Sequence, residues 1–121
     1  MTAVLLVAAG AAVGAPLRLL VDRWAREHSA AGTVLGTLVV NVVGSFVIGV
    51  VAGLPDPAAW LWPLVAVGFC GALTTFSTLA FELLVTFERA EWRPFTANLV
   101  LSLLLGGLAV WFGVLIGHAL P

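Results

Sequence analysis

Four long apolar stretches constrain the fold of this chain more than any other feature. Each is close to or longer than the ~20 residues that a helix needs to cross a hydrocarbon core ~30 Å thick. Hydrophobic residues make up 62% of the chain and charged residues only 9%, which is outside the range of soluble globular domains. The sequence therefore predicts an all-α integral membrane protein, one domain over residues 1–121, with four transmembrane helices in residues 2–20, 33–53, 58–87 and 95–120.

The segments between these stretches are short and polar. Residues 21–32 are predicted to form a polar loop, residues 54–57 a Pro-Asp-Pro turn and residues 88–94 a charged connection. The first stretch lacks a basic N-terminal flank, so we interpret it as a permanent span rather than a signal peptide. A net charge of −1 without a basic tract argues against nucleic acid as a partner. The single cysteine, Cys70, excludes an internal disulfide.

The third stretch is interrupted by polarity that a membrane helix does not need. Residues 68–79 read Gly-Phe-Cys-Gly-Ala-Leu-Thr-Thr-Phe-Ser-Thr-Leu, with two glycines and four hydroxyl side chains. Glycines weaken a helix, and in hydrocarbon each freed backbone carbonyl must find another partner. We therefore predict that the third helix is broken in the middle of the membrane and that this break is the functional centre.

Small residues recur at four-residue spacing in the predicted helices. Such pairs create flat faces that let backbones approach closely, within a subunit or across an oligomer interface. The pairs are Gly10 and Gly14, Gly32 and Gly36, Ser45 and Gly49, Gly49 and Gly53, and Gly113 and Gly117.

Amide and hydroxyl side chains form a stripe on two of the predicted helices. Asn41 and Ser45 lie one turn apart in the second, and Asn98 and Ser102 repeat that spacing in the fourth. Interhelical hydrogen bonds would explain any one of these residues, but together with the hydroxyl cluster they favour a conduit. Neutral donors, and the positive ring edge of Phe76, suit a small anion. The residues alone indicate no more than an anion path.

Two charged side chains fall near the same end of the first and third spans, Arg18 and Glu82. Three interpretations remain open for them: they extend to the interface, pair with each other, or line a vestibule. The chain carries no phosphate-binding loop, no Ser-His-Asp set and no paired carboxylates, so no catalytic residue is predicted and the chain is not expected to be an enzyme.

Three motifs resemble the Fluc (CrcB) family of bacterial fluoride channels, and the resemblance covers the whole chain. Residues 14–18 read Gly-Ala-Pro-Leu-Arg, residues 36–46 read Gly-Thr-Leu-Val-Val-Asn-Val-Val-Gly-Ser-Phe, and residues 71–78 read Gly-Ala-Leu-Thr-Thr-Phe-Ser-Thr. The resemblance implies an antiparallel dimer in a bacterial plasma membrane. It also implies two pores that let fluoride leave the cytoplasm passively, which reduces its toxicity.

The resemblance also implies roles for individual residues. A structural sodium ion, which is not transported, is expected at the backbone carbonyls of Gly71 and Thr74. Asn41, Phe76 and Ser102 are expected to line the pore. Positions implied to lie beside the pore or in its vestibule are Arg18, Thr75, Ser77, Thr78, Leu79 and Glu82.

Two other classes of function remain as alternatives. A small four-helix multidrug transporter would need a membrane-embedded acid in its first span for proton coupling, and residues 2–20 contain none. A non-conducting structural membrane subunit would account for the small-residue faces but not for the broken third helix.

Two features set this chain apart from the family pattern. The family usually continues Thr-Thr-Phe-Ser-Thr-Phe, whereas Leu79 occupies the last position here and lacks a ring edge for an anion. Basic residues also fall on one side of the predicted bundle, so the positive-inside rule predicts both termini outside. An antiparallel dimer then requires an inverted paralogue that supplies the missing phenylalanine, or otherwise a second copy of the chain itself. The basic residues are Arg18, Arg23, Arg26, Arg89 and Arg93.

Overall fold

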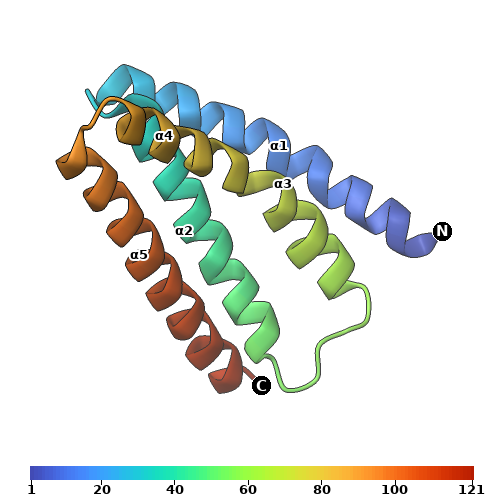
Figure 1. The fold of residues 1–121 in the computed structure, drawn as a ribbon. Coiled ribbons are helices and arrows are strands. Elements are labelled where there is room, and N and C mark those ends of the chain that lie inside the picture. The colour runs from blue at the N-terminus through green and yellow to red at the C-terminus, as the bar shows by residue number, and fades with distance from the viewer.

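The computed structural model describes residues 1–121 and is entirely helical, which confirms the predicted fold class (Figure 1). Four helical segments are long and apolar enough to cross a membrane, and the third of them, Trp62–Glu88, is divided into three pieces. The helices are α1 (Thr2–His28), α2 (Gly32–Gly53), the π-helix η1 (Trp62–Cys70), α3 (Gly71–Leu73), α4 (Phe76–Glu88) and α5 (Trp92–Ala119).

Helix α1 continues well beyond the apolar stretch, so the prediction of a polar loop over residues 21–32 was wrong. The helix ends at His28, and only residues 29–31 connect it to α2. Two features stabilise the polar extension. Asp22 and Arg26 form an ion pair of 3.1 Å at i, i+4 spacing, and Ala25 is fully buried. The end of a hydrophobic stretch indicates where a helix leaves the membrane. The helix itself can continue beyond that point, as α1 does here.

The ends of the other spans differ less from the prediction. The third span begins at Trp62 rather than at residue 58, and α5 begins at Trp92 rather than at residue 95. Pro94 therefore lies in the first turn of α5, where a missing N–H costs no helical hydrogen bond.

Glycine faces hold the helices together in pairs. Helix α5 packs along α2, and a Cβ atom added to Gly113 would lie 2.8 Å from the backbone nitrogen of Val50. Helix α1 packs on η1 in the same way, where a Cβ atom on Gly10 would lie 2.6 Å from the backbone nitrogen of Phe69. Neither position has room for a side chain, so these predicted small-residue faces serve packing within the subunit.

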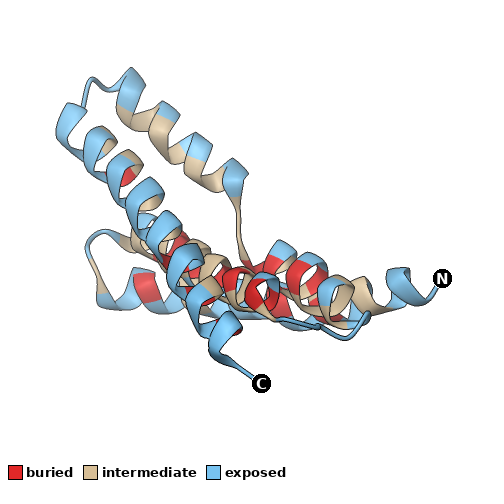
Figure 2. Ribbon diagram, turned by 90° about the horizontal axis from the view of Figure 1, so that it is seen from below, coloured by how far each residue is buried: buried red, intermediate tan, exposed pale blue.

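The third span breaks at two extended residues, which confirms the predicted interruption. Thr74 has φ −80° and ψ 159°, and Thr75 has φ −149° and ψ 119°, before the helix resumes at Phe76. Helix α4 therefore separates from the η1–α1 pair, as Figure 2 shows, and contacts α5. No residue of α4 is buried within the chain, whereas buried residues gather where the other helices cross (Figure 2).

Candidate functional site

The amide side chain of Asn41 holds the break in its extended form. Its Oδ1 accepts a hydrogen bond of 2.8 Å from the backbone N–H of Thr75, and its Nδ2 donates one of 3.1 Å to the Thr75 carbonyl. The amide thus satisfies both backbone polar groups of Thr75, which no helical hydrogen bond satisfies. A primary amide carries a second N–H, and the Asn41 side chain makes no other hydrogen bond in the chain.

The hydroxyl groups after the break cap helix α4. Thr75 Oγ1 accepts a hydrogen bond of 3.2 Å from the backbone N–H of Thr78 and donates one of 3.0 Å to Thr78 Oγ1. It also lies 3.3 Å from Ser77 Oγ. Thr75 is therefore the N-cap of α4, at the end of the helix that carries a partial positive charge. Thr74 differs, because its hydroxyl donates to the carbonyl of Cys70 at 2.8 Å.

Backbone carbonyls at the break fit a hard cation. The carbonyl oxygen of Thr74 accepts no hydrogen bond from any backbone or side-chain donor of the chain. Gly71 faces open space, because a Cβ atom added there would meet nothing within 4 Å. Hard cations such as sodium take oxygen ligands of this kind, so the Thr74 carbonyl fits the ion, and the sodium site stays a prediction.

Glu82 joins three helices through its carboxylate. Oε1 accepts a hydrogen bond of 2.9 Å from Thr37 Oγ1 on α2, and Oε2 accepts one of 3.3 Å from Asn98 Nδ2 on α5. Ser102 Oγ then donates to Asn98 Oδ1 at 3.2 Å. Thr37 and Asn98 are buried, with 5% and 8% of their surface exposed. The sequence interpretation missed Thr37, although it lies one helical turn before Asn41 on the same face of α2.

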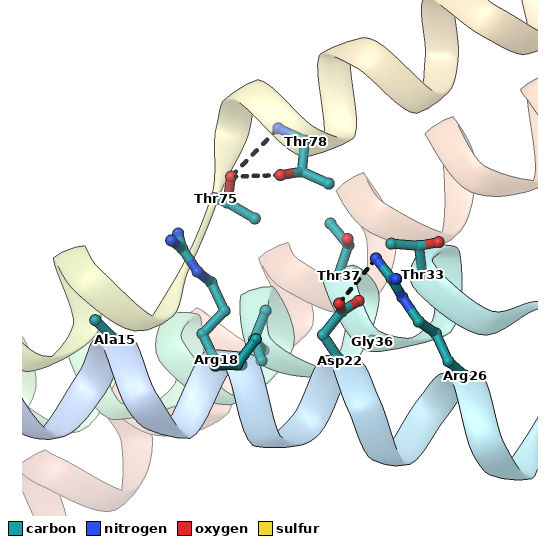
Figure 3. A pocket seen from close by; sticks show the side chains of 11 residues that line it. Ala15, Arg18, Asp22, Arg26, Thr33, Gly36, Thr37, Thr75 and Thr78 are labelled. Atoms are coloured by element: carbon teal, nitrogen blue, oxygen red, sulfur yellow. Dashed lines mark hydrogen bonds and ion pairs between the residues drawn. The ribbon is translucent and has the colours of Figure 1, made fainter.

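Arg18 does not pair with Glu82, which removes one of the three interpretations of these charges. The ion pair between Asp22 and Arg26 is the only one in the chain, and Arg18 makes no hydrogen bond to it or to any other residue. The Arg18 side chain instead extends from α1 toward Thr75 (Figure 3).

A cavity of about 440 Å³ lies between α1, α2 and the break. Arginine, aspartate and threonine side chains supply most of its polar surface, and Thr75 and Thr78 lie at the side formed by the third span (Figure 3). The structure thus brings together Arg18, Thr75 and Thr78, three of the predicted site residues, and Asn41 is bonded to one of them. The cavity is lined by Ala15, Arg18, Leu19, Asp22, Arg26, Thr33, Gly36, Thr37, Val40, Thr75 and Thr78.

The other predicted site residues do not line this cavity. Phe76 is 83% exposed, and Ser77 is exposed beside it. Ser102 and Glu82 belong to the hydrogen-bonded group between α4 and α5. Leu79 and Gly71 lie on the third span, outside the cavity lining. Within one chain, the predicted site residues therefore form two polar groups and an exposed face of the third span.

The chain is similar to known proteins over nearly its whole length. Residues 5–114 match the family described as CrcB-like protein, Camphor Resistance (CrcB). A Geobacillus kaustophilus protein named fluoride-specific ion channel FluC 1 is 42% identical over 119 residues, which cover 98% of this chain and 100% of that protein. A Shewanella sp. protein named fluoride-specific ion channel FluC is 40% identical over 116 residues, 93% of this chain and 94% of that protein. One from Vibrio cholerae with the same name is 38% identical over 112 residues, 88% of each chain. With four membrane-spanning helices, a broken third helix and a family match over nearly its whole length, the chain belongs to the CrcB-like protein family.

Proposed function

We propose that this protein is a fluoride-specific ion channel that lets fluoride leave the cytoplasm passively and is not an enzyme. The observation that carries the proposal is the break after Thr74, held open by Asn41 and facing a cavity that contains Arg18. Neutral donors beside an arginine can replace the hydration shell of a small anion. The transported ion is inferred from relatives of similar length that carry fluoride in their names.

The arrangement suggests a route for the anion. Arg18 attracts the anion into the cavity, where the hydroxyl of Thr78, whose proton no hydrogen bond in the chain uses, takes the place of water. The second N–H of Asn41 is the next donor along the break. We further propose that the ring edge of Phe76 and the hydroxyl of Ser102 line the pore, as the family resemblance implies.

We also propose that the working channel is an antiparallel dimer. Three features support this proposal: Phe76 is 83% exposed, α4 has no buried residue, and Gly71 faces open space. A second subunit could pack on these surfaces and would also bring further carbonyls to the sodium site. A sodium ion bound by the carbonyls of Gly71 and Thr74 would neutralise their partial negative charges. It would be structural and would not be transported.

Fluoride flux through the isolated protein tests the proposal. Two preparations of fluoride-loaded liposomes are compared, one with this chain alone and one with the chain and an inverted paralogue. We expect the working dimer to release fluoride to a fluoride electrode, with release of chloride near that of empty liposomes. If the chain conducts only with a partner, flux should appear after co-reconstitution with an inverted paralogue. A chain that passes no fluoride in either preparation would contradict the proposed function.

The arginines predict one fixed orientation in a bacterial plasma membrane. The end of α1 and the connection between α4 and α5 lie at the same end of the bundle (Figure 1). The opposite end carries none of the five basic residues, so the positive-inside rule places both termini outside. An antiparallel dimer then needs a partner of opposite orientation, and we propose an inverted paralogue with phenylalanine at the position of Leu79.

Terminal tags test the orientation directly. We expect a tag at either end of the chain to be labelled from outside intact cells in nearly every molecule. As a control for the rule itself, changing Arg89 and Arg93 to glutamine should increase the fraction of molecules with the tag inside, because it removes two of the five basic residues. Equal populations inside and outside in the unmodified chain would refute a fixed orientation and would favour a homodimer.

A further inference from the structure

Three charged residues of α1 follow one another along the cavity. Arg18, Asp22 and Arg26 are spaced four residues apart, so they lie on one face of the helix, and all three line the cavity. Figure 3 shows them side by side, with Asp22 between the two arginines. An anion that moves along this face toward the break must therefore pass a carboxylate.

The carboxylate of Asp22 is paired with Arg26 and lies close to α2. Its Oδ2 lies 3.1 Å from Nη2 of Arg26. On the other side it lies against Gly36 of α2, where an added Cβ atom would be 3.5 Å from Oδ1. The Asp22 side chain is 25% exposed and that of Arg26 is 62% exposed, so the pair lies at the edge of the cavity, with Arg26 toward solvent.

Asp22 lowers the positive charge of the cavity lining. Two arginines and one aspartate are the only ionisable residues in its lining, which gives a formal charge of +1. The charge of Arg26 is largely cancelled by Asp22, and Arg18 has no partner. Glu82 is not in the cavity lining, but its carboxylate accepts a hydrogen bond from Thr37, which is.

We propose that Asp22 limits anion permeation by cancelling the attraction of Arg26 at the mouth of the cavity. This inference rests on the proposed channel function and names a residue that sets its rate. Removing the carboxylate leaves two arginines facing the same cavity, so more anions enter it per unit time. The effect of Asp22 on flux is electrostatic, so it should be largest at low fluoride concentration and low ionic strength.

A charge series at two positions tests the proposal by fluoride flux in liposomes. Asp22→Asn should raise the initial flux about two- to fourfold at low salt, and Arg26→Gln should lower it by a similar factor. The double variant has the formal charge of the original cavity and should return to the original flux. Glu27→Gln changes the net charge of the chain as Asp22→Asn does, but Glu27 is exposed and does not line the cavity, so its flux should be unchanged.

The opposite signs separate this proposal from a structural role for the ion pair. Both single variants break the same pair, so loss of helix packing would lower flux in both and would leave the double variant no better. In 1 M of a non-halide salt, where the Debye length is about 3 Å, the electrostatic differences should largely disappear. If Asp22→Asn does not fold, Asp22→Ser tests the same loss of charge.

Each outcome of this series has a distinct meaning. Unchanged or reduced flux in folded Asp22→Asn and Asp22→Ser, with a conducting wild-type chain, would overturn the inference and leave the proposed function intact. A wild-type chain that passes no fluoride, alone or with its partner, would overturn the proposed function itself.

Discussion

Replacing Asn41 by aspartate is expected to reduce fluoride flux on the order of 100-fold, because a fixed negative charge at the break repels the permeating anion. Aspartate has nearly the shape of asparagine and can still accept the hydrogen bond from the Thr75 N–H. It cannot donate to the Thr75 carbonyl when it is ionised, so one of the two bonds at the break is also lost. The measurement is fluoride efflux from liposomes at matched amounts of folded protein.

Asn41→Leu is the matched control, because it removes both hydrogen bonds without adding a charge. The backbone N–H and C=O of Thr75 lose their partners, which should destabilise the folded chain by about 2–4 kcal/mol. If Asn41 acts on the anion, flux per folded molecule should be lower in the aspartate variant than in the leucine variant. Lower flux in the leucine variant would mean that Asn41 acts only on the shape of the break. Normal flux in a folded aspartate variant would contradict the proposed path.

Complete removal of sodium is expected to weaken the assembled channel and to abolish flux. An ion that binds only the assembly stabilises it by mass action, by about 2.7 kcal/mol when its concentration is 100 times its dissociation constant. The Thr74 carbonyl, which accepts no hydrogen bond in the chain, would then lose its proposed partner in the membrane. Size-exclusion chromatography in detergent and fluoride efflux should both change when sodium is replaced by N-methylglucamine.

Readdition of sodium serves as the control for damage during its removal. Assembly and flux should return over the same range of sodium concentration, because one binding event would govern both. The Thr74→Ser variant should behave as the original chain, since the proposed ligand is a backbone carbonyl and not the side chain. Unchanged assembly and flux after exhaustive removal of sodium would refute the sodium site.

The hydrophobic pattern predicted the architecture because the bilayer imposes a simple constraint. A membrane-spanning helix must be long and apolar, and the four stretches met this requirement without information about their neighbours. The break in the third span was also predictable. Glycines and hydroxyl groups between residues 68 and 79 are costly in hydrocarbon unless the chain uses them, and the helix is interrupted at Thr74 and Thr75.

The sequence alone determined where the polar residues of the site occur, but not which of them meet. Asn41 and Thr75 are 34 residues apart, and Thr37 and Glu82 are 45 apart, so their hydrogen bonds depend on how the helices pack. Only the tertiary structure decided that Arg18 lines a cavity together with Asp22 and Arg26 and does not pair with Glu82. Arg18, Asp22 and Arg26 share one face because α1 continues as a helix beyond its hydrophobic stretch. In a helix, residues four positions apart lie on the same face, whether or not the segment is apolar.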